Sequence, residues 1–110
     1  MATGLIGKAA LAANTYTAVA ETSDAHTINI RVVNRDMQNE VAICLALCPA
    51  TWESGAPDEA DYIEPVNLIL PPGGVLEDTG LITSPGEQVV AFSSTSTVTV
   101  RVHGVLEEVA

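Results

Sequence analysis

The sequence predicts an all-β protein: a single compact β-sandwich of about seven or eight short antiparallel strands, jelly-roll-like, with an extended N-terminal arm. Val, Ile and Thr, which are favoured in strands, supply 31 of the 110 residues. They occur in short runs separated by Gly, Pro, Asn and Asp, and these turn signals recur about every ten residues. A chain of 110 residues buries enough surface for one core, so we expect one domain.

Composition and charge exclude several classes of function. Four Lys and Arg residues stand against 14 Asp and Glu residues, which gives a net charge of −10 with neutral histidines. So few cations cannot neutralise a phosphate backbone, and we therefore expect no binding to nucleic acid or to an anionic membrane. No apolar run approaches the roughly 18 residues of a membrane helix, and the N-terminus lacks the charge order of an export signal, so we expect a soluble chain.

The N-terminal residues 1–13 lack the alternation of a strand. Their alanines favour a helix by propensity, but Gly4, Gly7 and the short length oppose one. We therefore interpret residues 1–13 as an extended arm that precedes a sandwich of residues 14–110. The apolar side chains of this arm that we expect to contact a partner are Leu5, Ile6 and Leu11.

Seven segments carry the pattern of strands. His26–Asn34 alternates apolar and polar residues, which indicates one buried face. Residues 40–48 are apolar at every position after the first, which indicates a strand covered on both faces by a second layer or by a neighbouring subunit. Residues 95–105 alternate again, with valines on the inner face. The expected strands are residues 15–20, 26–34, 40–48, 62–70, 75–82, 88–92 and 95–105.

Loop and turn signals separate these strands. Residues 49–61 contain Trp52 and four acidic residues without alternation, so we expect a loop. Two prolines and two glycines at residues 71–74 end the fourth expected strand, because proline lacks a backbone donor and glycine accepts positive φ. Residues 84–87, with Pro85 and Gly86, predict a second turn.

Cys44 and Cys48 are the only cysteines. On a strand they lie about 13 Å apart, whereas the Cα atoms of a disulfide lie within about 7 Å, so a strand excludes a disulfide between them. We expect two small buried thiols. A zinc half-site is the alternative, but it requires two further ligands, and only His26 and His103 are available.

Two other groups of residues offer chemistry. Asp24 lies near His26, and several serines lie near residue 95, but no Gly-x-Ser-x-Gly motif supports a serine hydrolase. The densest acidic cluster consists of Asp58, Glu59, Asp61 and Glu64. Its spacing matches no EF-hand loop, so we interpret it as a solvated acidic loop and leave cation binding open. We assign no catalytic residue, cofactor or metal.

Arg31 and Arg35 stand out because positive residues are few. Arg31 is expected to point outward from a strand, and Arg35 lies in a turn. Pairing with carboxylates of the same chain is one interpretation, and an ion pair at an interface is the other. Trp52, in the expected loop, is a further candidate for contact with a partner.

Five motifs follow one another over nearly the whole chain. They are Ile30-Arg31-Val32-Val33-Asn34-Arg35, Ala60-Asp61-Tyr62-Ile63-Glu64, Leu70-Pro71-Pro72-Gly73-Gly74-Val75-Leu76-Glu77-Asp78-Thr79-Gly80, Ser84-Pro85-Gly86-Glu87 and Val100-Arg101-Val102-His103-Gly104. With the Met-Ala-Thr-Gly opening, this order resembles a group of small structural proteins of tailed bacteriophages. The excursion between Cys48 and Pro57, which contains Trp52, departs from the pattern.

The resemblance implies a non-enzymatic β-sandwich on the virion, assembled in the host cytoplasm. A capsid decoration (cement) protein is the first expectation, with the major capsid protein or other virion proteins as partners. The chain is also expected to form a homo-oligomer, a trimer being one candidate. A tail, baseplate or fibre-attachment component is the alternative, and a carbohydrate- or metal-binding β-sandwich module is a further one. Few exposed aromatic residues are present for a sugar site.

Overall fold

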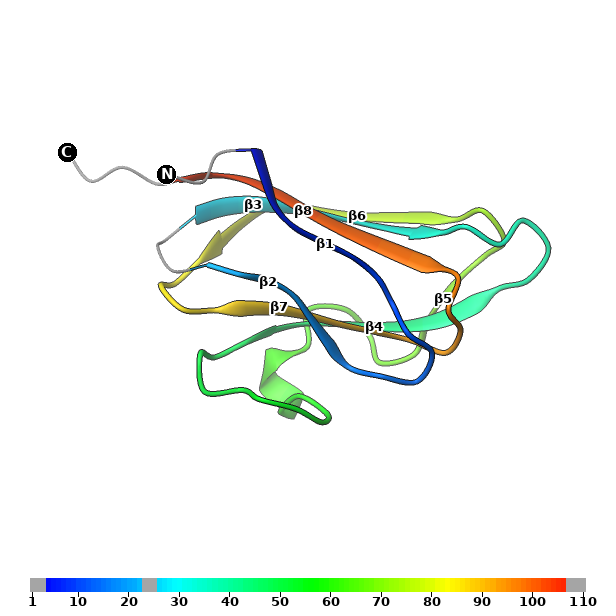
Figure 1. Ribbon diagram of the computed structural model, residues 1–110, viewed down its shortest axis with the longest axis horizontal. Coiled ribbons are helices and arrows are strands. Elements are labelled where there is room, and N and C mark those ends of the chain that lie inside the picture. Colours follow the sequence, from blue (N-terminus) through cyan, green and yellow to red (C-terminus); the bar gives the residue numbers. More distant parts are fainter. Residues whose placement is uncertain (1–3, 23–25, 107–110) are drawn as a thin grey trace.

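The computed structural model describes residues 4–22 and 26–106, which form two four-stranded antiparallel sheets (Figure 1). The strands are β1 (Gly4–Ala10), β2 (Thr17–Glu21), β3 (His26–Asn34), β4 (Val41–Cys48), β5 (Leu68–Leu70), β6 (Val75–Thr83), β7 (Gln88–Ser93) and β8 (Val98–Leu106). Sheet A has the order β1-β8-β3-β6, and sheet B has the order β2-β7-β4-β5. The all-β prediction is confirmed.

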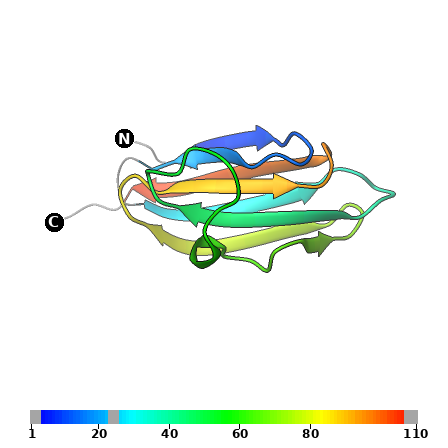
Figure 2. The ribbon, with the colours of Figure 1, turned by 90° about the horizontal axis from the view of Figure 1, so that it is seen from below.

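Helical structure is confined, within the described residues, to the single-turn 3₁₀ helix η1 (Glu59–Asp61). It lies in the connection between β4 and β5, which crosses the molecule as a long loop (Figure 2). None of the described residues belongs to a helix with the length and apolar character needed to span a membrane.

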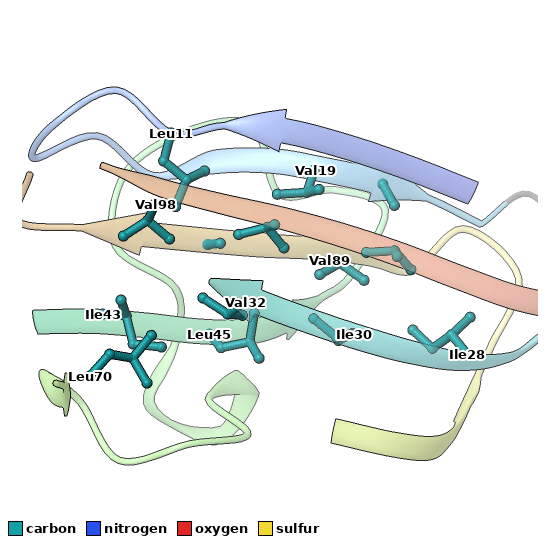
Figure 3. Close-up of a cluster of buried hydrophobic side chains, with 14 of the residues drawn as sticks. Leu11, Val19, Ile28, Ile30, Val32, Ile43, Leu45, Leu70, Val89 and Val98 are labelled. Atoms are coloured by element: carbon teal, nitrogen blue, oxygen red, sulfur yellow. The ribbon is translucent and has the colours of Figure 1, made fainter. Parts of the chain in front are cut away.

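The core fills the space between the two sheets (Figure 3). The inward residues of sheet A are Ile28, Ile30 and Val32 of β3 and Val98, Val100 and Val102 of β8, each at most 1% exposed. Sheet B contributes Val41, Ile43 and Leu45 of β4 and Val89 and Ala91 of β7. This cluster is aliphatic throughout, and each fully buried Val, Leu or Ile contributes about 1.5–3 kcal/mol of transfer free energy.

The predicted N-terminal arm is wrong for residues 4–13. β1 pairs with β8 along its length and forms one edge of sheet A. Leu11, directly after β1, is 2% exposed and belongs to the core. Local alternation did not reveal this strand because a register shift between Leu5 and Gly7 interrupts it. Residues 1–3 lie outside the described part of the chain.

The predicted strand over residues 62–70 is too long, because only its last three residues form β5. Asn67, directly before β5, has φ of 60°, a left-handed conformation that regular strands do not adopt. Tyr62 makes one isolated bridge to Ala46 of β4. The segment between them therefore follows sheet B without continuing its ladder.

All four edge strands are interrupted or short. β1, β2 and β6 each contain a register shift, and β5 has only three residues. In β6 the shift lies next to Gly80, which has φ of 69° and donates its backbone N–H to Oδ1 of Asn29, at 3.0 Å. Interruptions of this kind keep an exposed edge from pairing with a strand of another molecule.

Candidate functional site

A loop of the chain covers the outer face of sheet B. Residues 49–67 connect β4 to β5, and the part up to Tyr62 lies on the side of sheet B that faces away from sheet A (Figure 1), whereas Ile63 packs against the main core. Trp52 and Tyr62 of this loop, together with Tyr16, pack on a second apolar cluster. That cluster consists of Ala46, Cys48 and Val90. The second face of β4 is therefore covered by the loop.

Polar contacts hold this loop in place. Tyr16 and Tyr62 share a hydrogen bond of 3.2 Å between their hydroxyl groups, and the Tyr16 ring packs 4.7 Å from the Phe92 ring. The hydrogen bond with Tyr62, followed by burial, raises the pKa of Tyr16. Gln88 of β7 donates its Nε2 to the backbone oxygen of Trp52, at 2.9 Å. The loop is thus fixed against sheet B by packing and by hydrogen bonds.

Both cysteines are free thiols inside the protein, as predicted. Cys44 is 2% exposed and Cys48 is 0% exposed. Burial, with a smaller contribution from the charge of Asp61, raises the pKa of Cys48 to about 11. Because the thiolate is the reactive form, Cys48 is a poor nucleophile and a poor metal ligand at neutral pH.

The acidic cluster divides in the structure. Asp58, Glu59 and Asp61 lie at η1, whereas the Glu64 carboxyl interacts with the Asp78 carboxyl of β6. Oδ2 of Asp78 is buried and has no hydrogen-bond partner among the described residues. The interaction with the Asp78 carboxyl, followed by burial, raises the pKa of Glu64. Among residues 4–22 and 26–106, no three His, Cys, Asp or Glu side chains converge for a metal ion.

The other predicted chemistry is dispersed. Asp24 and the side chain of His26 lie outside what the structure describes. Near residue 95, Ser93 donates its hydroxyl to the backbone oxygen of Thr95, at 2.6 Å, and serves the turn between β7 and β8. The described residues enclose no pocket.

The residues predicted to form a partner interface do not form one surface. Leu5 is exposed on β1, Ile6 packs partly buried against the core, and Leu11 lies inside the core. Trp52 lies on the opposite side of the molecule, over sheet B. Arg35 donates its guanidinium to the backbone oxygen of Ser96, at 2.8 Å.

The outer face of sheet A carries a row of basic side chains that local sequence patterns did not reveal. The strand register places Lys8 of β1 opposite Arg101 of β8, and Arg101 opposite Arg31 of β3. Arg31 is opposite Glu77 of β6, with which it forms the one ion pair found in the described residues. The basic row, Lys8, Arg101 and Arg31, is exposed and contains three of the four Lys and Arg residues.

Apolar side chains surround the basic row on the same face. The register places them outward on the same sheet, and their exposures are large. They are Leu5 at 43%, Val75 at 44%, Val105 at 58% and Ile82 at 71%. His103 lies next to the row and accepts a hydrogen bond from Nε of Arg101, at 3.3 Å. The outer face of sheet A thus combines cations with exposed apolar area, whereas the outer face of sheet B is covered around Ala46, Cys48 and Val90 and exposes Ile69 of β5, at 49%.

Comparisons with known proteins add no relative. No protein-family model, no curated protein and no solved structure matches the chain.

Proposed function

We propose that the protein is a non-enzymatic structural protein of a tailed-phage virion, and specifically a capsid decoration protein that binds and stabilises the head shell. We also propose that its fold is a jelly roll. The sequence resemblance to small phage structural proteins is the starting point, and three features of the structure support it.

Strand pairing supports the jelly roll. β1 pairs with β8, β2 with β7, β3 with β6, and β4 with β5. These pairs are those of one long antiparallel ribbon whose ends are β1 and β8 and whose turn lies between β4 and β5. Folding the ribbon over brings β3 beside β8 and β4 beside β7. Eight-stranded jelly rolls of this kind recur in viral capsid proteins, and also in lectins and cupins.

The contrast between the two outer sheet faces is the observation that carries the proposal. The outer face of sheet B is covered in its middle by Trp52 and Tyr62, and the sheet edges are interrupted. Sheet A leaves one outer face with charged and apolar side chains open to a partner. A decoration protein requires this combination, because it must attach through one surface while its other surfaces resist further association.

The net charge is consistent with a protein that stays monodisperse in solution before it assembles on the particle. At −10, the copies repel one another in solution, which keeps an abundant small protein dispersed until it meets its binding site. On the particle, a homo-oligomer that places several copies on neighbouring sites gains avidity without new types of contact.

Co-sedimentation tests the proposed function. Purified protein is mixed with heads, and separately with tails, from phage that lack this protein. We expect it to sediment with heads at saturable stoichiometry and to raise the temperature at which the heads rupture. Sedimentation with tails alone would establish the tail alternative, and sedimentation with neither would show that a virion role is wrong.

A further inference from the structure

We infer that the outer face of sheet A is the docking face, and that the basic row binds an acidic surface of the head-shell protein. This inference rests on the proposed function and identifies the surface and the chemistry of its partner. Three features support it: the sheet faces that remain exposed, the positive charges of the row, and the distance between the row and the carboxylates beyond sheet B.

The other candidate surfaces are less suited to docking. Trp52 and Tyr62 pack on the second apolar cluster and cover the middle of the outer face of sheet B, and what stays exposed there is uncharged, namely Ala18 of β2 and Ile69 of β5. The edges of both sheets are interrupted by register shifts or limited to three residues, so strand addition is disfavoured. In the described part of the chain, the outer face of sheet A is the sheet surface that combines cations with several exposed apolar side chains.

The basic row has one carboxylate partner among the described residues. Lys8, Arg101 and Arg31 are successive neighbours across three strands, and like charges directly opposite on a sheet repel. Only Arg31 has a carboxylate partner among the described residues, Glu77. Arg101 uses Nε for His103, which leaves its terminal N–H groups available. Carboxylates of a partner would relieve the repulsion and accept paired hydrogen bonds from the guanidinium.

The distribution of charge sets the orientation of docking. Glu53, Asp58, Glu59 and Asp61 lie on the loop beyond sheet B, on the far side of the molecule from the basic row (Figure 1). Packed sheets are about 10 Å apart, and charges in physiological salt are screened over about 8 Å. A partner surface touching sheet A therefore interacts with the basic row and hardly with those carboxylates. Because three of the four Lys and Arg residues lie on this face, we expect a chain of net charge −10 to approach an acidic surface through it.

A pair of variants with equal net charge tests the docking face. Arg101→Glu replaces the centre of the basic row and changes the net charge from −10 to −12, because one positive charge is lost and one negative charge is added. The double variant Thr51→Glu/Ser54→Glu adds two negative charges to exposed positions of the loop and gives the same −12. Arg101→Lys keeps the positive charge. Circular dichroism establishes that each variant is folded.

Binding to heads is measured for each protein in 0.15 M salt. We expect Arg101→Glu to weaken binding about tenfold or more, while the loop double variant stays within about twofold of wild type and Arg101→Lys retains most of the affinity. Raising the salt to about 1 M, where screening acts over about 3 Å, should weaken wild-type binding and remove the difference between the variants.

Three outcomes would overturn the inference. Equal binding by wild type and Arg101→Glu would show that sheet A is not the docking face while leaving the decoration role in place. Equal weakening by both −12 variants would show an effect of net charge alone. Binding of wild type to duplex DNA that Arg101→Glu abolishes would show that the basic row recognises phosphate. Failure of wild type to bind heads would instead remove the proposed function itself.

Discussion

The hydroxyl groups of Tyr16 and Tyr62 lie 3.2 Å apart and join the loop over sheet B to the segment that precedes β2. The two residues are separated by 45 intervening positions, so this bond ties distant parts of the chain together. It lies at the border of the second apolar cluster, where the two rings shield Ala46 and Cys48. With the hydrogen bond from Gln88 to Trp52, this contact holds the loop against the outer face of sheet B.

Tyr62→Phe should destabilise the protein by about 1 kcal/mol, because it removes one partly buried hydrogen bond and keeps the ring. Tyr16→Phe should cost a similar amount, and the double variant little more than either, since both changes remove the same bond. Urea unfolding followed by circular dichroism measures the three free energies. Fully additive losses would show that the two hydroxyl groups act independently.

Leu11→Ala should destabilise the protein by about 2–5 kcal/mol, because it opens a cavity in the core. Leu5→Ala is the matched control, since the same side chain is removed from an exposed position on the preceding strand. Its expected cost is under about 1 kcal/mol. Thermal unfolding of the two variants distinguishes a packed N-terminal strand from a free arm, because a free arm would make both changes equally mild.

Gly7→Ala should destabilise the protein by about 1–3 kcal/mol through overpacking. Gly7 lies where β1 approaches β2, and an added Cβ would lie 2.8 Å from the Cβ of Ala20 and would collide with the backbone oxygen of Val19. Lys8→Ala, at the neighbouring exposed position, should change the free energy of unfolding by less than about 0.5 kcal/mol. Equal stability of the two variants would contradict the close approach of the two strands.

Glu64→Gln should stabilise the protein at neutral pH and flatten its pH dependence. The hydrogen bond with Asp78 raises the pKa of Glu64 in the folded state, so its contribution to stability is complete below the ordinary pKa of Glu, about 4.3. That contribution is lost as the pH rises through the folded pKa. Glutamine carries an amide N–H at every pH, so it can donate to the Asp78 carboxyl without taking up a proton.

Melting temperatures of wild type and Glu64→Gln between pH 4.5 and 8 test this pair. The gain from the substitution should be largest at the alkaline end and should shrink as the pH falls. Glu59→Gln, an exposed change on η1, removes the same formal charge and should leave the wild-type profile in place. A uniform gain at all pH values in both variants would indicate a general charge effect.

The native thiols should react slowly with a disulfide reagent at pH 8. Cys44 and Cys48 are nearly inaccessible, and burial raises the pKa of Cys48 to about 11, so little thiolate is present. Unfolding in guanidinium should release both thiols within seconds, and intact mass should match two reduced cysteines. Immediate reaction of the folded protein would contradict the covered outer face of sheet B.

Local alternation predicted the strands that bury one regular face. β3 and β8 repeat apolar residues at every second position, and the structure buries them as predicted. β1 was not predicted, because its register shift interrupts the two-residue alternation and its glycines resemble those of a linker. The covering of β4 was predicted, but not what covers it, because Trp52 and Tyr62 return to the strand from a segment without any periodic pattern.

The basic row could not be predicted from the sequence, for a different reason. Lys8 and Arg101 are opposite each other only through the pairing of the first strand with the last, and no local pattern encodes that register. Arg31 was singled out because cations are rare, and its outward direction was confirmed. The significance of its neighbours became visible only once β1, β8 and β3 were placed side by side.

Gly4 and Gly104 are partners in the β1–β8 ladder, so the beginning of the first strand and the end of the last strand lie at the same end of the molecule. A short linker from the end of β8 to the start of β1 can therefore join these two strands, and a new opening can be made in an exposed loop such as residues 37–40. A circularly permuted chain of this kind should fold and melt in one cooperative transition. A protein fused to the new termini of the permuted chain would lie at the opposite end of the two sheets from one fused to the original termini.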